Sequence, residues 1–306
     1  MNFLVILICL TINYVWLKDA DRFSDSWFFK FQDQMHTLTA ASAQKLATGW
    51  WTPLLLIYSI PLLAIWAMLL VTDALFFGVL VMFLHIIVLL IAFDRTQPGK
   101  LANDFLDLWK QGDTSACIAY LEKEMATDTV DLAKDDHDHL ARFFGMQMTY
   151  RCFEKMFVTF FWYMATGPLG IVFTYITYQL RDSHNENVPV AAKQFNRVLV
   201  RVLEWGPLRL LALSFSLAGN FVKSFGRLKE VMWDFSLDAN YAELLFDFAG
   251  LALFESDQLP VIDNGSEMPV ERAKIAASIE ALQALLERSQ LIWLSVLALI
   301  TVFGIN

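Results

Sequence analysis

The sequence predicts an all-α, polytopic helical membrane protein with about five to six membrane segments, one of them broken at a Gly-Pro pair, and with cytoplasmic helical segments. Of its 306 residues, 57% are hydrophobic, whereas soluble chains contain roughly 45–50%. The 26 Phe and 10 Trp suit aromatic belts at the two membrane interfaces. A net charge of −9 without clustered Lys and Arg argues against nucleic acid as a partner, so we expect the lipid bilayer instead.

Residues 1–93 are predicted to form an N-terminal membrane region. It begins with a short span at Phe3–Leu17, which we expect to be retained because no basic segment or Ala-x-Ala cleavage site marks a signal peptide. An amphipathic segment within Asp19–Thr48 is expected on the membrane surface. Gly49–Val71 and Ala74–Phe93 are the strongest spans, and a turn at Thr72-Asp73 should join them as a helical hairpin.

The rest of the chain divides into four further segments. We expect cytoplasmic helices in 94–154 and 223–290, a broken helix and a central Pro-x-Arg-Leu segment in 155–222, and a last span in 291–306. A helix starting near residue 269 should run without interruption into that last span. Lys and Arg are frequent in 94–155, which predicts that this segment faces the cytoplasm. We favour six crossings, with a re-entrant hairpin in 157–180 as the alternative because residues 181–209 are also basic.

Phe157–Leu180 is apolar but contains the sequence Thr-Gly-Pro-Leu-Gly at 166–170. A proline and two glycines at this depth predict a kink or a broken helix. Broken helices within a membrane are tolerated only where they are buried in protein or line a cavity. This break is therefore a candidate functional site.

Leu203–Phe221 is the segment around which the chain is organised. It is predicted to turn at Gly206-Pro207, and it carries Arg209 into an otherwise apolar run. A charge there is costly without a partner, so Arg209 either anchors the segment at the headgroups or belongs to a site. Small and polar residues follow at near-helical spacing and predict the close approach of another helix. They are Ser214, Ser216, Gly219 and Asn220.

Sequence motifs of soluble enzymes are absent from the chain. There is no phosphate-binding Gly-x-x-x-x-Gly-Lys-Ser/Thr loop, no Gly-x-Ser-x-Gly elbow and no His-Glu-x-x-His. The run from Asp135 to His139 contains metal-ligand residue types, but adjacent helical residues diverge by about 100°, so we interpret it as a solvated helix start. We expect no metal, no cofactor and free thiols at the three cysteines. His85 lies within a span and is interpreted as an imidazole bonded to a neighbouring helix, with a functional role as the alternative.

Polar and glycine residues near the expected cytoplasmic ends of the spans form the candidate ligand pocket. Glu154 and Glu204 are each expected to pair with an arginine, because bidentate carboxylate–guanidinium contacts are strong. A structural ion-pair network is one interpretation; a pocket for an anionic or peptide-like small molecule is the other, and a protein partner in the membrane is also considered. The candidates are Arg151, Glu154, Trp162, Gly167, Pro168, Tyr175, Arg201, Glu204, Arg209, Asn220 and Asn240.

The pattern Leu-x-Trp-x-Pro-x-Arg-Leu at 203–210, followed by Leu-x-Gly-x-Phe at 217–221, resembles the AmpE family. Phe161-Trp162-Tyr163 and Gly167-Pro168-x-Gly170 add to the resemblance, which runs from about Phe143 to the C-terminus. It implies a bacterial inner-membrane protein that regulates chromosomal β-lactamase. The implied role is sensing or signalling linked to cell-wall recycling, alongside a cytoplasmic muramyl-amide amidase, and more in keeping with a modulator than with an enzyme.

A second resemblance is to the cobinamide synthases CobD and CbiB, which are distantly similar to that family. It implies a membrane-bound, amide-forming synthase, with Glu154, the Gly-Pro-x-Gly turn, Arg209 and Asn240 as matching positions. The acidic pair of those enzymes falls here near Val200-Arg201, and their Gly-Asp-Pro signature is missing from residues 1–40. The broken helix and His85 leave a transporter as a third hypothesis.

Overall fold

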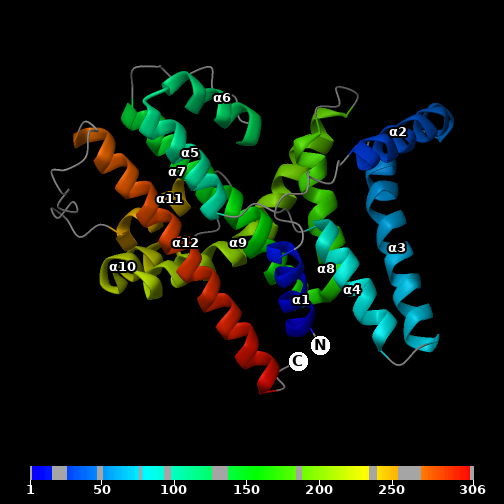
Figure 1. Cartoon of the computed structure of the whole chain (residues 1–306). Helices are drawn as coiled ribbons and strands as arrows, with labels where there is room; N and C mark the ends of the chain where they lie inside the picture. The colour runs from blue at the N-terminus through cyan, green and yellow to red at the C-terminus, as the bar shows by residue number, and fades with distance from the viewer. Residues whose placement is uncertain are drawn as a thin grey trace. The chain divides into compact units, whose positions relative to one another are not determined.

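The computed structural model describes residues 2–15, 26–46, 51–75, 78–92, 98–125, 137–183, 188–233, 240–253 and 270–303. Every regular element in these ranges is a helix, which confirms the predicted all-α class. The chain folds as two compact units (Figure 1). Unit 1 comprises Met1–Arg95 and Val158–Trp205, and unit 2 comprises Thr96–Phe157 and Gly206–Asn306.

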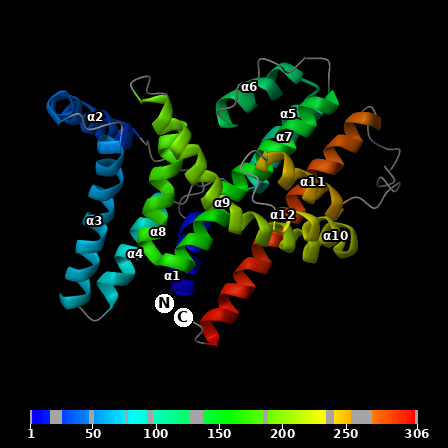
Figure 2. The same ribbon diagram turned by 180° about the vertical axis from the view of Figure 1, so that it is seen from behind.

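Unit 1 is built mainly from apolar helices. Its elements are α1 (Asn2–Val15), α2 (Ser26–Leu46), α3 (Trp51–Leu75), α4 (Val79–Ala92), α8 (Thr159–Asp182) and the first part of α9 (Val190–Ala218). Helix α8 packs against both α3 and α4, while α1 packs on α4 and α2 on α3 (Figure 2). Large side chains on the outer face of α3, such as Leu55 and Leu63, are about 60% exposed. Such a face is expected of a helix that borders lipid.

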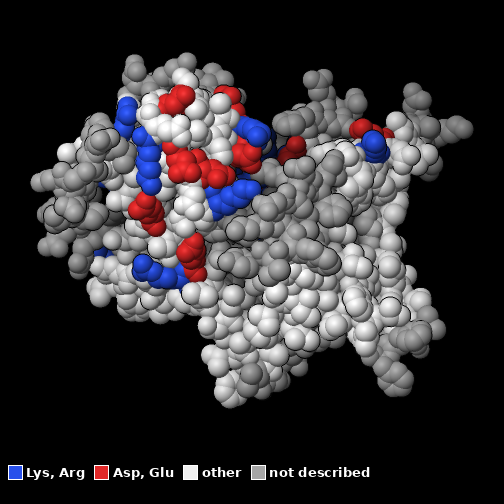
Figure 3. All heavy atoms as spheres, viewed as in Figure 1, with Lys and Arg blue, Asp and Glu red and all other residues white. Residues whose placement is uncertain are grey.

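Unit 2 contains several charged helices and one long helix whose C-terminal part is apolar. Its elements are α5 (Pro98–Gln111), α6 (Thr114–Met125), α7 (His137–Cys152), α10 (Phe221–Val231), α11 (Tyr241–Leu253), α12 (Val270–Val302) and the second part of α9. Helix α12 packs on α5 and α7, and α11 packs on α7 and α10. The rings of Phe105 and Phe144 stack in its core with centroids 3.8 Å apart. Charged side chains cover the part formed by α5, α6 and the first half of α12 (Figure 3).

Among the described residues, three helices are long and apolar enough to cross a membrane. These are Trp51–Thr72, His137–Asp182 and Arg272–Thr301, and the shorter helices Phe3–Ile12 and Val79–Ala92 are also apolar. They suit a membrane protein, and the larger number of about five to six crossings stays a prediction. Helix α12 is continuous from Val270 to Val302, which confirms the expected uninterrupted last helix.

Two predicted turns are wrong. Helix α3 continues through Thr72 to Leu75, because the Thr72 hydroxyl donates to the carbonyl oxygens of Met68 and Leu69 and so satisfies its polar group within the helix. The chain then reverses near Gly78, whose φ is 70°. The second wrong turn is Gly206-Pro207, because α9 runs through this pair without interruption.

Candidate functional site

The candidate residues are distributed over both units, and the contacts within each unit are described separately. Unit 1 carries Trp162, Gly167, Pro168, Tyr175, Arg201 and Glu204, whereas unit 2 carries Arg151, Glu154, Arg209, Asn220 and Asn240. The expected pairing of Glu154 and Glu204 with arginines stays a prediction.

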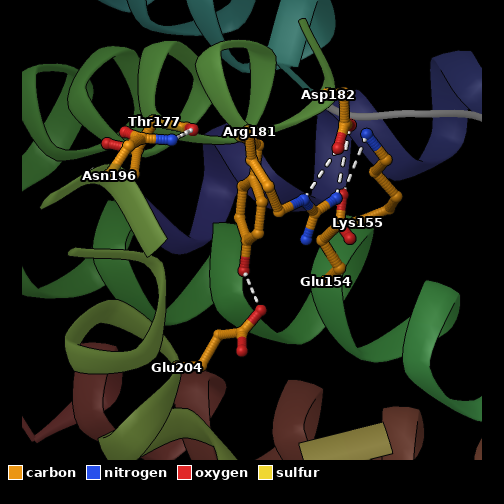
Figure 4. Close-up of polar contacts among 8 residues, drawn as sticks. Glu154, Lys155, Thr177, Arg181, Asp182, Asn196 and Glu204 are labelled. Carbon is orange, nitrogen blue, oxygen red and sulfur yellow. Dashed lines mark hydrogen bonds and ion pairs between the residues drawn. The ribbon is translucent and has the colours of Figure 1, made fainter. Parts of the chain in front are cut away.

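Glu204 is a buried carboxylate on α9, with 1% of its surface exposed. The hydroxyl of Tyr178 on α8 donates a hydrogen bond to Glu204 Oε1 at 2.9 Å, marked by the dashed line at Glu204 in Figure 4. The guanidinium carbon of Arg181 lies 4.8 Å from the centre of the Tyr178 ring. A carboxylate that loses its water must be stabilised by such groups, and its interactions are strong where the dielectric is low. This contact joins the two helices at a polar, buried point.

Trp162 explains how α9 passes through Pro207. A proline has no N–H, so the carbonyl oxygen four residues earlier, that of Leu203, loses its helical donor. The indole nitrogen of Trp162 donates to this oxygen at 3.0 Å. The side chain from α8 thereby replaces the missing backbone donor, and the helix continues where the sequence predicted a turn.

A second polar group in unit 1 was missed by the sequence interpretation. The Tyr58 hydroxyl on α3 lies 3.0 Å from both Thr177 Oγ1 and Asn196 Oδ1, and donates to the latter. Asn196 Nδ2 donates to the Thr177 carbonyl oxygen at 2.9 Å (Figure 4). Three helices, α3, α8 and α9, are therefore linked by one network, in which Thr177 and Asn196 are buried and Tyr58 is half-buried. Its signal in the sequence was an amide and a hydroxyl within helical segments, where each must find a partner.

The predicted break in α8 is confirmed at Gly167, whose φ of 68° and ψ of −151° lie outside the helical region. Only glycine adopts this conformation readily. Pro168 follows it directly, and an added Cβ at Gly170 would collide with the Thr166 hydroxyl. The break is thus specified by the local sequence Gly167-Pro168.

Tyr175 and His85 contribute to packing in unit 1. The Tyr175 ring stacks on Trp27 with centroids 6.1 Å apart, and it lies against an apolar cluster of Phe28, Ile57 and Ile176. His85 Nδ1 on α4 lies 2.9 Å from the Tyr163 hydroxyl on α8. This agrees with the interpretation of His85 as an imidazole bonded to a neighbouring helix. Arg201 is half-buried on α9.

Arg209 in unit 2 is 6% exposed and faces the C-terminus of α10. Its Nε donates to the Met232 carbonyl oxygen at 3.3 Å, and its Nη2 donates to the Val231 carbonyl oxygen at 3.4 Å. The last carbonyls of a helix lack internal donors and carry partial negative charge. One partner of this buried cation is therefore a helix end.

The small residues after Arg209 lie where other helices approach α9, as predicted. Trp293 Nε1 on α12 donates to Ser214 Oγ at 2.9 Å, and Ser216 Oγ donates to Ser224 Oγ on α10 at 3.0 Å. Gly219 lies against the backbone of Ala252 at the end of α11, where an added Cβ would be 2.9 Å from the Ala252 carbonyl carbon. The segment from Ser214 to Gly219, which ends one residue beyond α9, therefore contacts three helices of unit 2.

Asn220 and Asn240 begin helices. Asn220 Oδ1 accepts from the Lys223 amide at 3.4 Å at the start of α10. Asn240 Oδ1 accepts from the Ala242 amide at 3.2 Å at the start of α11. Asparagine is a favoured residue at such N-cap positions. Asn220 is half-buried and Asn240 is exposed. Because each caps a helix, the observed role of both is structural.

Glu154 lies in a π-helical turn, Phe153–Val158, between α7 and α8. It is 4% exposed, and its Oε1 lies 3.2 Å from Lys155 Nζ. Such turns insert an extra residue into a helix and are frequent at functional sites. Arg151, one turn earlier, is half-buried.

In the acidic run considered as a metal site, Asp135 and Asp136 lie outside the described residues, and no group of three or more candidate ligands converges among the residues that are described.

Comparison with known proteins identifies the family to which the chain belongs. A sequence model of the family described as regulatory signalling modulator protein AmpE matches residues 29–306, which is most of the chain. No curated protein and no solved structure matches. The resemblance seen in the Pro-x-Arg-Leu segment is thereby confirmed, and the chain belongs to the AmpE family.

Proposed function

We propose that this chain is a multi-pass protein of the bacterial inner membrane that modulates β-lactamase induction as part of signalling linked to cell-wall recycling. The description of the family as a regulatory signalling modulator supports the regulatory role. The three long apolar helices support a membrane location. The regulated element is the contact between Glu204 and Tyr178, which joins α8, the helix with the Gly167 break, to α9.

The burial of Glu204 is the observation that carries this proposal. A carboxylate with 1% exposure depends strongly on each partner, because water cannot replace a lost hydrogen bond. A ligand that competes for this carboxylate therefore shifts the packing of α8 against α9. The ligand class that fits is an anionic or peptide-like small molecule, in which an amide or ammonium group approaches Glu204 while a carboxylate approaches arginine. Arg201, on the same helix as Glu204, is the candidate cation.

The function is tested in a host with an inducible chromosomal β-lactamase. Deletion of the gene should change β-lactamase activity at each concentration of an inducing β-lactam, and the wild-type gene should restore it. Tyr178→Phe, which removes only the donor to Glu204, should restore it incompletely at equal protein abundance. Unchanged induction in the deletion strain would refute the regulatory role.

Complementation in a second host separates this role from the amide-forming alternative. Rescue of a cobinamide-synthase mutant by the wild-type gene, lost with Glu154→Gln, would favour the synthase. Glu154 is tested because it is buried in the π-helical turn. Failure to rescue, together with altered β-lactamase induction, is the result that the modulator role predicts.

A further inference from the structure

Helix α10 has an outer surface that is unusual for a helix in water. Val222 is 81% exposed and Phe221 is 46% exposed, and Trp233, just beyond the helix, is 77% exposed. The rings of Phe221 and Phe225 stack with centroids 4.8 Å apart and so form a continuous apolar surface. Exposed apolar patches of this kind mark sites that contact a partner or a membrane.

The same helix concentrates positive charge in an acidic protein. Between Phe221 and Val231 it carries Lys223, Arg227 and Lys229 against the single carboxylate of Glu230, whereas the whole chain has a net charge of −9. Arg227 pairs with Glu230 at 2.7 Å, which leaves Lys223 and Lys229 as the net charge of the helix. An acidic protein partner or an anionic lipid surface is complementary to this charge.

The residues of α10 divide into three faces at about 100° per residue. Ser224 and Leu228 are buried and hold the helix on unit 2. Phe221, Phe225 and Val222 lie along one edge, where Lys229 Nζ is 5.0 Å from the centre of the Phe225 ring. Lys223, Arg227 and Glu230 lie along the other edge. An apolar edge beside a charged edge with more cations than carboxylates is the arrangement of a helix that lies in a membrane interface.

A hydrogen bond fixes the start of α10 relative to the apolar part of α12. Arg288 Nη1 donates to the carbonyl oxygen of Ala218, three residues before Phe221. Arg288 is the last charged residue of α12, because Leu291–Val302 contains none. A helix that enters a bilayer passes the headgroup region where its charges end. The start of α10 therefore lies at the headgroup level, which selects the lipid surface over a partner in the aqueous phase.

We infer that α10 is an interfacial helix that binds anionic phospholipid headgroups. Lys223 and Lys229 contact the phosphates, while Phe221, Val222, Phe225 and Trp233 enter the boundary between headgroups and acyl chains. The inference rests on the membrane placement in the proposed function and adds the class of lipid that the protein recognises. Arg209 contributes by holding the C-terminus of the helix through the carbonyls of Val231 and Met232.

The test places an environment-sensitive nitrobenzoxadiazole label on single introduced cysteines of the full-length protein. The native cysteines, Cys9, Cys117 and Cys152, are buried, which limits competing labelling. The positions are Val222→Cys on α10, Val296→Cys on the apolar end of α12 and Val270→Cys at its charged end, all of them well exposed. The protein is reconstituted into phosphatidylcholine vesicles with and without phosphatidylglycerol, and quenching by a shallow doxyl-labelled lipid is compared with quenching by aqueous iodide.

We expect the label at 222 to be quenched by the shallow lipid, more strongly when phosphatidylglycerol is present, and the label at 270 to be quenched by iodide. Lys223→Gln with Lys229→Gln should abolish the response to phosphatidylglycerol, since each cation changes the preference for anionic lipid by about fivefold. Lys100→Gln with Lys123→Gln, two exposed cations of α5 and α6, should leave it unchanged.

Three outcomes overturn the inference, and they are distinguishable. Lipid quenching at 296 combined with iodide quenching at 222 would show that the protein is in the membrane while α10 is not. Iodide quenching at both 222 and 296 would refute the membrane placement itself, and with it the location given under the proposed function. A response to phosphatidylglycerol that survives the loss of both lysines would refute their role in headgroup binding.

Discussion

The indole nitrogen of Trp162 donates a hydrogen bond of 3.0 Å to the carbonyl oxygen of Leu203, the acceptor that Pro207 leaves without its helical donor. One side chain of α8 thus compensates for a proline within α9. The motif Trp-x-Pro-x-Arg-Leu is therefore compatible with a helix that continues without interruption, provided that a neighbouring helix supplies a donor. This is the physical reason why the predicted turn at Gly206-Pro207 is absent.

Trp162→Phe should destabilise the protein by about 1–3 kcal/mol, because the Leu203 carbonyl is left without a donor. Pro207→Ala restores the backbone N–H at position 207, so the Trp162→Phe change should be less harmful in that background. The free energies of unfolding of both single variants and the double variant, measured in detergent, give the coupling. Equal effects of Trp162→Phe in both backgrounds would contradict the compensation. Trp66→Phe, at a half-exposed tryptophan of α3, is the control.

Gly219→Ala should destabilise unit 2, because the added Cβ would lie 2.9 Å from both the carbonyl carbon and the Cβ of Ala252. Two of the three nearest atoms belong to the Ala252 backbone, so α9 or α11 must move. Gly226→Ala is the matched control, since nothing lies within 4 Å of its added Cβ. Alanine is favoured over glycine within a helix by roughly 1 kcal/mol, so the control should raise the melting temperature. Similar effects from the two substitutions would show that the contact at Ala252 is loose.

Arg209→Met should weaken the end of α10, because the carbonyls of Val231 and Met232 lose their donors. We expect a loss of about 1–3 kcal/mol, as for other hydrogen bonds from charged groups. Hydrogen exchange should accelerate first in the amides of the last turn of α10. The exchange rate in Arg209→Lys should lie between those of the wild type and Arg209→Met, since lysine keeps the charge but not the two donors in a fixed geometry. Exchange that is unchanged in α10 would place the role of Arg209 elsewhere.

Cys117 provides a prediction on pH. Burial raises the pKa of its thiol from the usual 9.0 to about 11, with a smaller contribution from Asp113 in the same direction and an opposing one from Arg272. The unfolded chain ionises this thiol at lower pH than the folded chain, so its contribution to stability falls as the pH rises from about 9 to about 11. The Cys117→Ala variant should therefore lose less melting temperature than the wild type over this pH window.

N-ethylmaleimide at pH 8 should label Cys117 only after unfolding, and rapid labelling of the folded protein would contradict its burial.

Some of these features follow directly from local sequence, and others do not. The break at Gly167 could be predicted because a Gly-Pro pair restricts the backbone by itself. The small residues at Ser214, Ser216 and Gly219 correctly predicted close helices, since spacing alone puts them near one face. The partner of Arg209 could not be predicted, because it is a set of main-chain carbonyls on another helix.

The same limit applies to the turns. Thr72 and Pro207 are residues that often end helices. Whether the helix ends there depends on a hydrogen-bonding partner that the residue itself does not reveal. For Thr72 the partner is the preceding turn of its own helix, and for Pro207 it is an indole from α8. The partners in the network of Tyr58, Thr177 and Asn196 likewise could not be assigned from the sequence, because Thr177 and Asn196 lie more than a hundred positions from Tyr58.

The proposed function depends most on the buried carboxylate of Glu204, and its direct test is β-lactamase induction in a strain that carries Glu204→Gln in place of the wild-type residue. The control is Glu280→Gln, which alters a 57% exposed carboxylate 3.7 Å from Lys110, a surface pair worth only about 0–1 kcal/mol. At equal protein abundance, Glu204→Gln should change the ratio of induced to basal β-lactamase activity, while Glu280→Gln should match the wild type. A wild-type ratio in the Glu204→Gln strain would contradict the account.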